Sequence, residues 1–85
     1  MNSRKLLESL EELSEKLSLD IKYDFFEGRG GLCSFKEKQF FLINKNLPPN
    51  EKAKVIARGL SSFNLENLSI LPLIRKFIES EKEQD

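Results

Sequence analysis

The sequence contains no histidine, and this absence excludes more chemistry than any other feature of its composition. Without imidazole there is no histidine general base near neutral pH, no Ser-His or Cys-His nucleophile activation and no histidine-ligated metal. Carboxylate or lysine chemistry would need burial to shift a pKa, and no segment of the chain clusters such groups. We therefore expect a protein that is not an enzyme and that holds no metal and no cofactor.

Cysteine is nearly absent as well. The single Cys33 excludes an intramolecular disulfide and any multi-cysteine metal site. It falls within a predicted strand, where we expect it to point into the core as an inert side chain. A reactive thiol needs exposure together with a helix N-terminus or a neighbouring cation, and Arg29, four residues away in the sequence, is not sufficient.

Long apolar runs are missing too. The longest is only a few residues, far short of the ~20 that a membrane-spanning helix needs. The first residues lead directly into a charged amphipathic stretch, and no signal peptide is visible. We expect a cytoplasmic protein with no membrane partner.

Neither sign of charge is in excess, since the chain has 14 basic and 14 acidic side chains. No global field would then attract DNA, RNA or an anionic membrane. The distribution is uneven: residues 21–58 hold eight positive and four negative charges, and each flanking segment holds three positive and five negative. We interpret this basic belt as solvated faces of differing sign and expect no nucleic-acid partner.

Hydrophobic periodicity is what the sequence does contain, and it predicts one small α+β domain over residues 1–85. The 39% hydrophobic and 33% charged residues suit a folded unit of this length. The patterns predict the order α-β-β-β-α-α, with about three helices packed against a small antiparallel sheet of about three strands. The predicted helices cover residues 3–18, 50–63 and 72–80, and the predicted strands cover residues 19–26, 32–36 and 39–44. Residues 64–70 fit either a loop or a short strand, and we expect residues 81–85 to be a disordered tail.

The first predicted helix and the first predicted strand differ clearly in the spacing of their apolar residues. A stripe of leucines at helical spacing comprises Leu6, Leu10, Leu13 and Leu17. The stripe is too short for a coiled coil and predicts packing on the sheet. In the strand that follows, Ile21, Tyr23 and Phe25 alternate with charged residues and are expected on one buried face.

The next two strands predict a hairpin. A two-residue loop at residues 37–38 sets Phe35 opposite Phe40, and Cys33 then lies opposite Leu42 on the same face. The residues of the other face are Leu32, Ser34, Phe41 and Ile43. Glu-Lys is a poor pair for a tight turn, so a longer or bulged loop stays open as an alternative. Because the second strand of the hairpin is apolar on both sides, one large residue lacks an obvious core position.

Three of the four glycines lie in the segment Gly28–Gly31, together with Arg29. Glycines let backbone N–H groups gather around an anion, and Arg29 is suited to a carboxylate or phosphate. A phosphate-binding loop runs from a strand into a helix, however, whereas this segment joins two predicted strands. A connection that needs positive φ is the favoured interpretation, and anion binding is the alternative.

Three segments follow one another between Gly30 and Phe63: GGLCSFK, QFFLINKN and LPPNEKAKVIARGLSSF. This pattern resembles the core of the ImmA/IrrE-type zinc metallopeptidases, in which a hairpin and a short leucine-rich loop lead to a helix with an HExxH zinc site. It resembles more closely a small group of bacterial proteins that share RGGLC, a hairpin, LPP and a helix without zinc ligands. Carried over by position, the zinc histidines would fall at Arg58 and Ser62 and the catalytic glutamate at Gly59. The resemblance thus implies the fold without the activity.

Protein–protein interaction or self-association is the favoured function, because the apolar surface exceeds what the predicted core needs. The candidates for this surplus surface are Phe26, Phe40 or Phe41. One alternative is an anion or peptide-ligand binder that uses the Gly28–Gly31 loop, and another is a degenerate metallopeptidase-like domain; an unusual enzyme is the least favoured. The candidate contact residues are Arg29, Gly30, Gly31, Phe26, Phe41 and Arg58.

Overall fold

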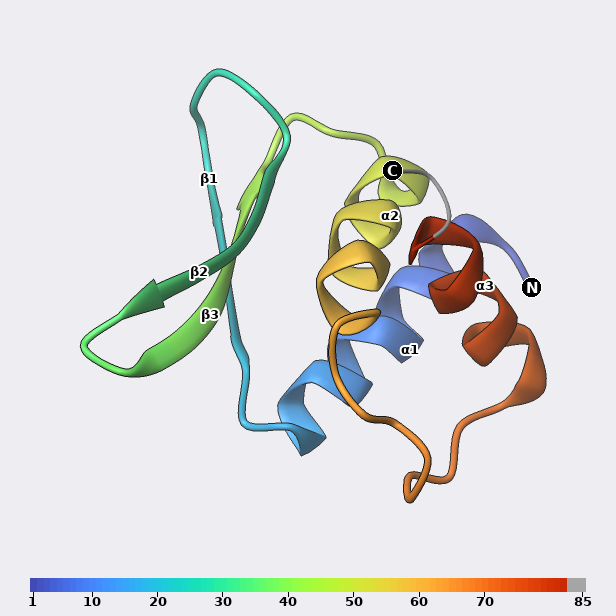
Figure 1. Cartoon of the computed structure of the whole chain (residues 1–85). Coiled ribbons are helices and arrows are strands. Elements are labelled where there is room, and N and C mark those ends of the chain that lie inside the picture. Colours follow the sequence, from blue (N-terminus) through green and yellow to red (C-terminus); the bar gives the residue numbers. More distant parts are fainter. Residues whose placement is uncertain (83–85) are drawn as a thin grey trace.

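The computed structural model describes residues 1–82, and its elements follow the predicted order α-β-β-β-α-α (Figure 1). The helices are α1 (Ser3–Lys16), α2 (Pro49–Leu60) and α3 (Pro72–Lys82). The strands are β1 (Asp20–Asp24), β2 (Gly30–Phe35) and β3 (Lys38–Asn44). The predicted α+β fold is therefore confirmed. None of the helices in this described part has the length and apolar character required to cross a bilayer.

The three strands form a mixed sheet in the order β1-β3-β2. β2 is antiparallel to β3, as predicted, but β1 is parallel to β3, so the prediction of an antiparallel sheet is wrong for the first strand. β1 does not pair with the strand that follows it, because the segment between them carries the chain across to the far edge. β3 is the most apolar strand, and the central position buries its Phe41 and Ile43 completely.

The β2–β3 hairpin turns at residues 36–37, one residue before the predicted loop. Both residues have positive φ, 49° and 67°, which is the pattern of a type I′ turn whose twist matches the flanking strands. Phe40 consequently lies opposite Cys33 instead of Phe35, and the predicted register is corrected by two residues. A shift of two residues preserves side-chain alternation, so the predicted division of the hairpin into two faces is correct.

All three helices lie on the same side of the sheet (Figure 1). α1 packs mainly on α2 and to a smaller extent on β1, so the predicted packing of its leucine stripe on the sheet is only partly correct. α2 also packs against β2 and β3, and α3 packs mainly on α2. The buried hydrophobic core between them comprises Leu10, Leu13, Leu19, Phe41, Ile43, Ala53, Val55, Ile56, Ala57, Leu60, Leu65, Ile74 and Ile78. We call the other side of the sheet the open face, because no described element covers it. Its residues are Asp20, Lys22 and Asp24 of β1, Gly31, Cys33 and Phe35 of β2, and Lys38, Phe40, Leu42 and Asn44 of β3.

The ring of Phe41 packs between the central strand and α2. A Cβ placed on Gly59 would lie 2.4 Å from Cε1 of Phe41, so α2 approaches the sheet this closely only because residue 59 has no side chain. Phe41 has no exposed surface, and its prediction as a contact residue is therefore wrong. The large residue without a core position is Phe40, which is half-buried on the open face.

β1 is joined to α1 by a polar contact as well as by packing. The hydroxyl of Tyr23 donates a hydrogen bond to Oε2 of Glu11 at 2.5 Å. Burial, together with the neighbouring carboxylate, raises the pKa of Tyr23, so its hydroxyl remains a donor at neutral pH. Phe25, predicted to share the buried face with Tyr23, lies beyond the end of β1 and is 62% exposed.

The segment between α2 and α3 is a loop of turns without a strand, which resolves the alternative left open for residues 64–70. The guanidinium of Arg75 holds this loop, donating through Nη2 to the carbonyls of Leu65 at 3.3 Å and Leu68 at 3.2 Å. α3 continues through residues 81–82, and Glu81 is buried, so the expected disordered tail does not begin at residue 81. Residues 83–85 of that predicted tail lie outside the described part.

The contact between Gly59 and Phe41 predicts that Gly59→Ala destabilises the fold. Alanine favours a helix over glycine by about 1 kcal/mol, but forcing a methyl group against a buried ring costs about 1–3 kcal/mol. We expect a net loss of stability of up to about 2 kcal/mol, measured as a lower urea midpoint. In a Phe41→Leu background the same substitution should cost less, because the smaller side chain makes room. An increase in stability on Gly59→Ala alone would contradict this packing.

Candidate functional site

The structure brings two candidate regions that are distant in sequence to one pocket. Arg29, Gly30 and Gly31 line one wall, and Arg58 on α2 lines the opposite wall. The pocket has a volume of about 420 Å³, and its remaining lining residues are Leu32, Lys54, Val55, Gly59 and Glu81. We call it the β2–α2 pocket. It exists because α2 lies over β2 on the covered side of the sheet.

The glycines of the segment before β2 are required by its backbone. Gly28 and Gly30 have φ values of 103° and 102°, which favour glycine. A Cβ on Gly30 would lie 2.0 Å from the carbonyl oxygen of Leu42 in the neighbouring strand. These features support the strand-connection interpretation of the segment.

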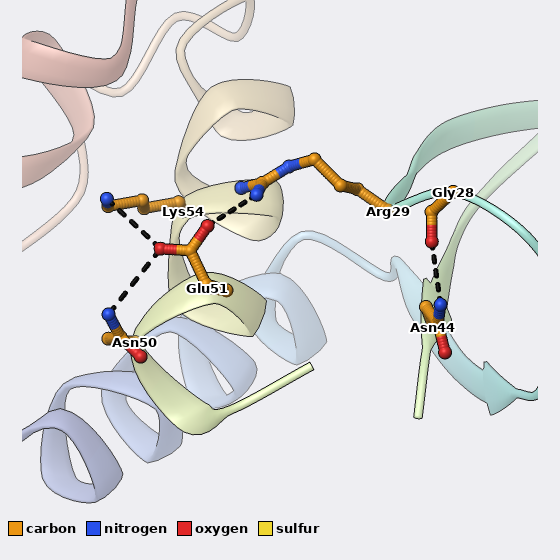
Figure 2. A network of polar contacts seen from close by, with 6 residues as sticks. All are labelled: Gly28, Arg29, Asn44, Asn50, Glu51 and Lys54. Atoms are coloured by element: carbon orange, nitrogen blue, oxygen red, sulfur yellow. Dashed lines mark hydrogen bonds and ion pairs between the residues drawn. The ribbon is translucent and has the colours of Figure 1, made fainter. Parts of the chain in front are cut away.

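Asn44, at the end of β3, fastens the same segment to the sheet. Its Nδ2 donates to the carbonyl oxygens of Phe26 at 2.9 Å and Gly28 at 2.7 Å, and the second contact is drawn in Figure 2. Its backbone N–H donates to the carbonyl of Arg29 at 3.0 Å. Phe26, a predicted contact residue, is half-buried and is held here through its main chain. Asn44 therefore positions Arg29 at the mouth of the pocket.

Glu51, in the first turn of α2, is the polar centre of the pocket's rim. Figure 2 shows its carboxylate contacting Arg29, Lys54 and Asn50. Oε1 accepts from Nη1 of Arg29, and Oε2 lies 3.1 Å from Nζ of Lys54. The hydrogen bonds from Arg29 and then from Lys54 hold the pKa of Glu51 below its ordinary value. The guanidinium of Arg29 is thus already engaged by a carboxylate of the chain itself.

The remaining charges of the pocket are of both signs. Arg58 is exposed at its rim, and Glu81 reaches it from α3 with only 8% of its surface exposed. Arg29, Lys54 and Arg58 are balanced in part by the two glutamates, so the pocket is a mixed-charge site rather than a purely cationic one. Among residues 1–82, no group of three or more acidic or cysteine side chains is placed to hold a metal ion.

The positions carried over from the zinc-peptidase pattern are separated in the structure. Arg58 lies at the pocket rim, whereas Gly59 faces the Phe41 ring and has no room for a side chain. Ser62 lies beyond the last residue of α2, and its hydroxyl donates to the carbonyl of Gly59 at 2.9 Å. Residues 58 and 62 therefore do not share a helical face as an HExxH pair does.

A second candidate surface is the part of the open face that lies over β2 and β3. Phe35 is 65% exposed, and Cys33, Phe40 and Leu42 beside it are half-buried. The ammonium of Lys22 lies 5.0 Å from the centre of the Phe40 ring and covers part of it. Cys33 belongs to this face, so the expectation that it points into the core is wrong. We call these four residues, Cys33, Phe35, Phe40 and Leu42, the apolar patch.

Sequence reasoning found the two arginines and the glycines but missed the residues that organise them. Glu51 and Lys54 were open to prediction, because oppositely charged residues three apart on a helix commonly pair. Glu81 carried no signal in the sequence, since only the packing of α3 on α2 brings it to the pocket.

Comparison with known proteins adds no further assignment. No protein-family model, curated protein or solved structure matches the chain. The geometry of the β2–α2 pocket and of the apolar patch is therefore the basis on which a function is inferred.

The ion pairs of Glu51 predict a pH-dependent contribution to stability. Because its folded-state pKa is depressed, the contribution is present above the ordinary value of 4.5 and is lost as the pH falls through the folded value. Glu51→Gln should therefore lower the urea midpoint at pH 7, and the difference from the unaltered protein should shrink as the pH is lowered below 4.5. Glu12→Gln is the control, since Glu12 is exposed and forms no ion pair within residues 1–82. A difference that does not shrink with falling pH would show that the pairs do not favour the charged carboxylate.

Proposed function

We propose that this protein is a non-catalytic interaction module that self-associates through its uncovered sheet. The observation that carries the proposal is the apolar patch, in which Phe35 exposes 65% of its surface on a side of the sheet that no described helix covers. An antiparallel hairpin with one solvated face ordinarily carries polar residues on that face. Contiguous apolar side chains there are typical of a surface that binds another protein.

The charge pattern supports an association between copies of the chain. The chain as a whole has no net charge, so two copies approach each other without long-range repulsion. The apolar patch itself contains no charged residue, and the ammonium groups of Lys22 and Lys36 lie over two of its rings. The support for self-association is therefore the zero net charge of the whole chain together with the apolar side chains of the patch.

The non-catalytic part of the proposal is supported by the absence of imidazole and by the lack of room for a side chain at residue 59. It is compatible with a degenerate metallopeptidase-like core. We place the protein in the cytoplasm, where a half-buried free thiol such as that of Cys33 stays reduced.

Light scattering across protein concentrations tests the proposal. We expect the mass to rise from 9.9 kDa towards twice this value at micromolar concentrations. Phe35→Thr should weaken the association about tenfold or more, because a buried aromatic side chain contributes about 1.5–3 kcal/mol. Leu71→Ser is the matched control, since Leu71 is equally exposed but lies in the loop before α3, away from the sheet. A monomer at every concentration would overturn the proposal.

Binding of an anionic ligand in the β2–α2 pocket is the second candidate function. The observation that favours it is the convergence of Arg29, Gly30, Gly31 and Arg58 on one pocket. The carboxylate of Glu51 already satisfies Arg29, so a ligand anion would have to displace it or share the guanidinium.

Titration with inorganic phosphate and with a short acidic peptide, followed by NMR shifts, tests this second candidate. If the pocket binds anions, Arg29→Ala should abolish the shifts while lowering the melting temperature by a few degrees at most, because an ion pair this exposed contributes about 0–1 kcal/mol. Arg4→Ala, an exposed arginine of α1, should change neither quantity. If Arg29→Ala lowers the melting temperature by many degrees, Arg29 has a structural role and this candidate fails.

A further inference from the structure

The two edges of the sheet differ in how they are protected. The open-face residues of β1 are Asp20, Lys22 and Asp24, and all three are charged and exposed. Charged side chains on an edge strand discourage pairing with another strand. β2, Gly30–Phe35, contains no charged residue and no proline, and none of the described strands pairs with its outer side. The unprotected edge is therefore that of β2, next to the apolar patch.

The backbone of β2 directs alternate residues towards that edge. The backbone N–H of Asn44 donates to the carbonyl of Arg29 at 3.0 Å, so the polar groups of Arg29 face β3. In an antiparallel pair the N–H and C=O of one residue point to the same side, and the side alternates along the strand. Gly30, Leu32 and Ser34 consequently direct their N–H and C=O groups outward, where they are available to a further strand.

We propose that β2 pairs in antiparallel orientation with β2 of a second copy, about a two-fold axis that passes beside Cys33. This inference rests on the proposed function and names the contact by which the copies associate. The three strands of each copy then form one continuous sheet. The apolar patch of each copy reaches the axis, so the two patches join into one surface.

The register follows from the bounds of the strand. A two-fold axis places one residue opposite its own counterpart in the second copy, and the axes that pair most of the strand lie at Leu32 or at Cys33. The Leu32 axis sets Phe35 opposite Arg29 of the second copy, which lies before the start of β2. The Cys33 axis sets Phe35 opposite Gly31 of the second copy, which lies within β2. The Cys33 axis therefore keeps Phe35 within the paired part of the two strands.

The same register gives Phe35 a partner surface. Phe35 lies opposite Gly31 of the second copy, so its exposed ring covers a position that has no side chain. Leu32 and Ser34 of the second copy form hydrogen-bonded pairs, since both direct their backbone groups to the edge. On the helix side, the β2–α2 pocket leaves space beside Leu32 for the incoming strand.

The two Cys33 residues then form a non-hydrogen-bonded pair across the axis. In such pairs the Cα atoms lie about 4.5 Å apart, which is within the range of about 4.4–6.8 Å that a disulfide requires. Cys33 is the only cysteine, so a covalent dimer reports this contact. Under the Leu32 register, Cys33 lies opposite Gly31 and the two thiols are offset along the strands.

Ser34→Pro tests the edge without disturbing the monomer. The N–H that proline removes faces away from β3, and proline is tolerated on an edge strand at such a position. We expect the light-scattering mass to return to that of the monomer, with the dissociation constant raised about tenfold or more because two N–H donors are lost per dimer. Ser34→Thr retains the N–H and should dimerise as the unaltered chain does. Circular dichroism and the melting temperature check that both variants are folded.

Oxidative crosslinking of the unaltered protein tests the register independently of any substitution. Diamide takes two electrons and two protons from the two thiols, which join as a disulfide while the diamide becomes a hydrazine. We expect rapid formation of a covalent dimer on a non-reducing gel and at least tenfold slower formation for Ser34→Pro, because only random collisions then bring the thiols together. Equal rates for the two proteins would overturn the inference.

Phe40→Thr separates this inference from the proposed function. Phe40 lies on the central strand and does not reach the second copy across the β2 edge, so this variant should still form a dimer. If Phe40→Thr abolishes the dimer and Ser34→Pro does not, the copies pack through their open faces; the proposed function then stands and the edge pairing fails. A dimer that resists crosslinking contradicts the Cys33 register. A chain that is monomeric throughout contradicts both proposals.

Discussion

The packing of Phe41 against Gly59 is the contact on which the arrangement of the remaining elements depends. Because residue 59 has no side chain, α2 lies close enough to the sheet to cover the ring of the central strand completely. This approach places Arg58 and Lys54 beside β2 and so creates the β2–α2 pocket. It also assigns all three helices to one side, since α3 packs on α2. Because all three helices lie on that side, the opposite side of the sheet is left as the open face.

The polar contacts around the pocket are made between residues of the chain itself and hold its two walls together. Asn44 binds the carbonyls of the glycine segment, and Glu51 ties that segment to α2 through Arg29 (Figure 2). A guanidinium with a carboxylate of its own chain beside it binds a foreign anion less readily than a vacant one, because the existing pair must be displaced. Glu81 adds a second negative charge to the same pocket. For this reason the apolar patch, which no described helix covers, is the stronger basis for a function.

Charge is distributed over the sheet in a way that leaves one region uncharged, namely β2 and the apolar patch. The open-face residues of β1 are charged, while β2 is neutral and contributes Cys33 and Phe35 to the apolar patch. A module that kept its sheet fully solvated would have no need of Phe35 and Phe40 on the outer side. Pairing at the β2 edge and contact across the open face are alternative uses of the same unprotected region, and the thiol of Cys33 lies within both.

Local periodicity determined the elements, because the spacing of apolar side chains in a helix or strand depends only on neighbours in the chain. The α1 helix with its buried leucine stripe and the two faces of the hairpin were therefore predicted correctly from the sequence, whereas the main packing partner of α1, the helix α2, was not. The candidate arginines and glycines were also found, since guanidinium groups and positive-φ positions are properties of single residues. Only the tertiary structure decided that β1 runs parallel to β3, that Phe41 is buried while Phe40 is not, and that Glu51 pairs with Arg29. These outcomes depend on which strand occupies the centre of the sheet and how closely α2 approaches it, and contacts between residues far apart in the chain set both.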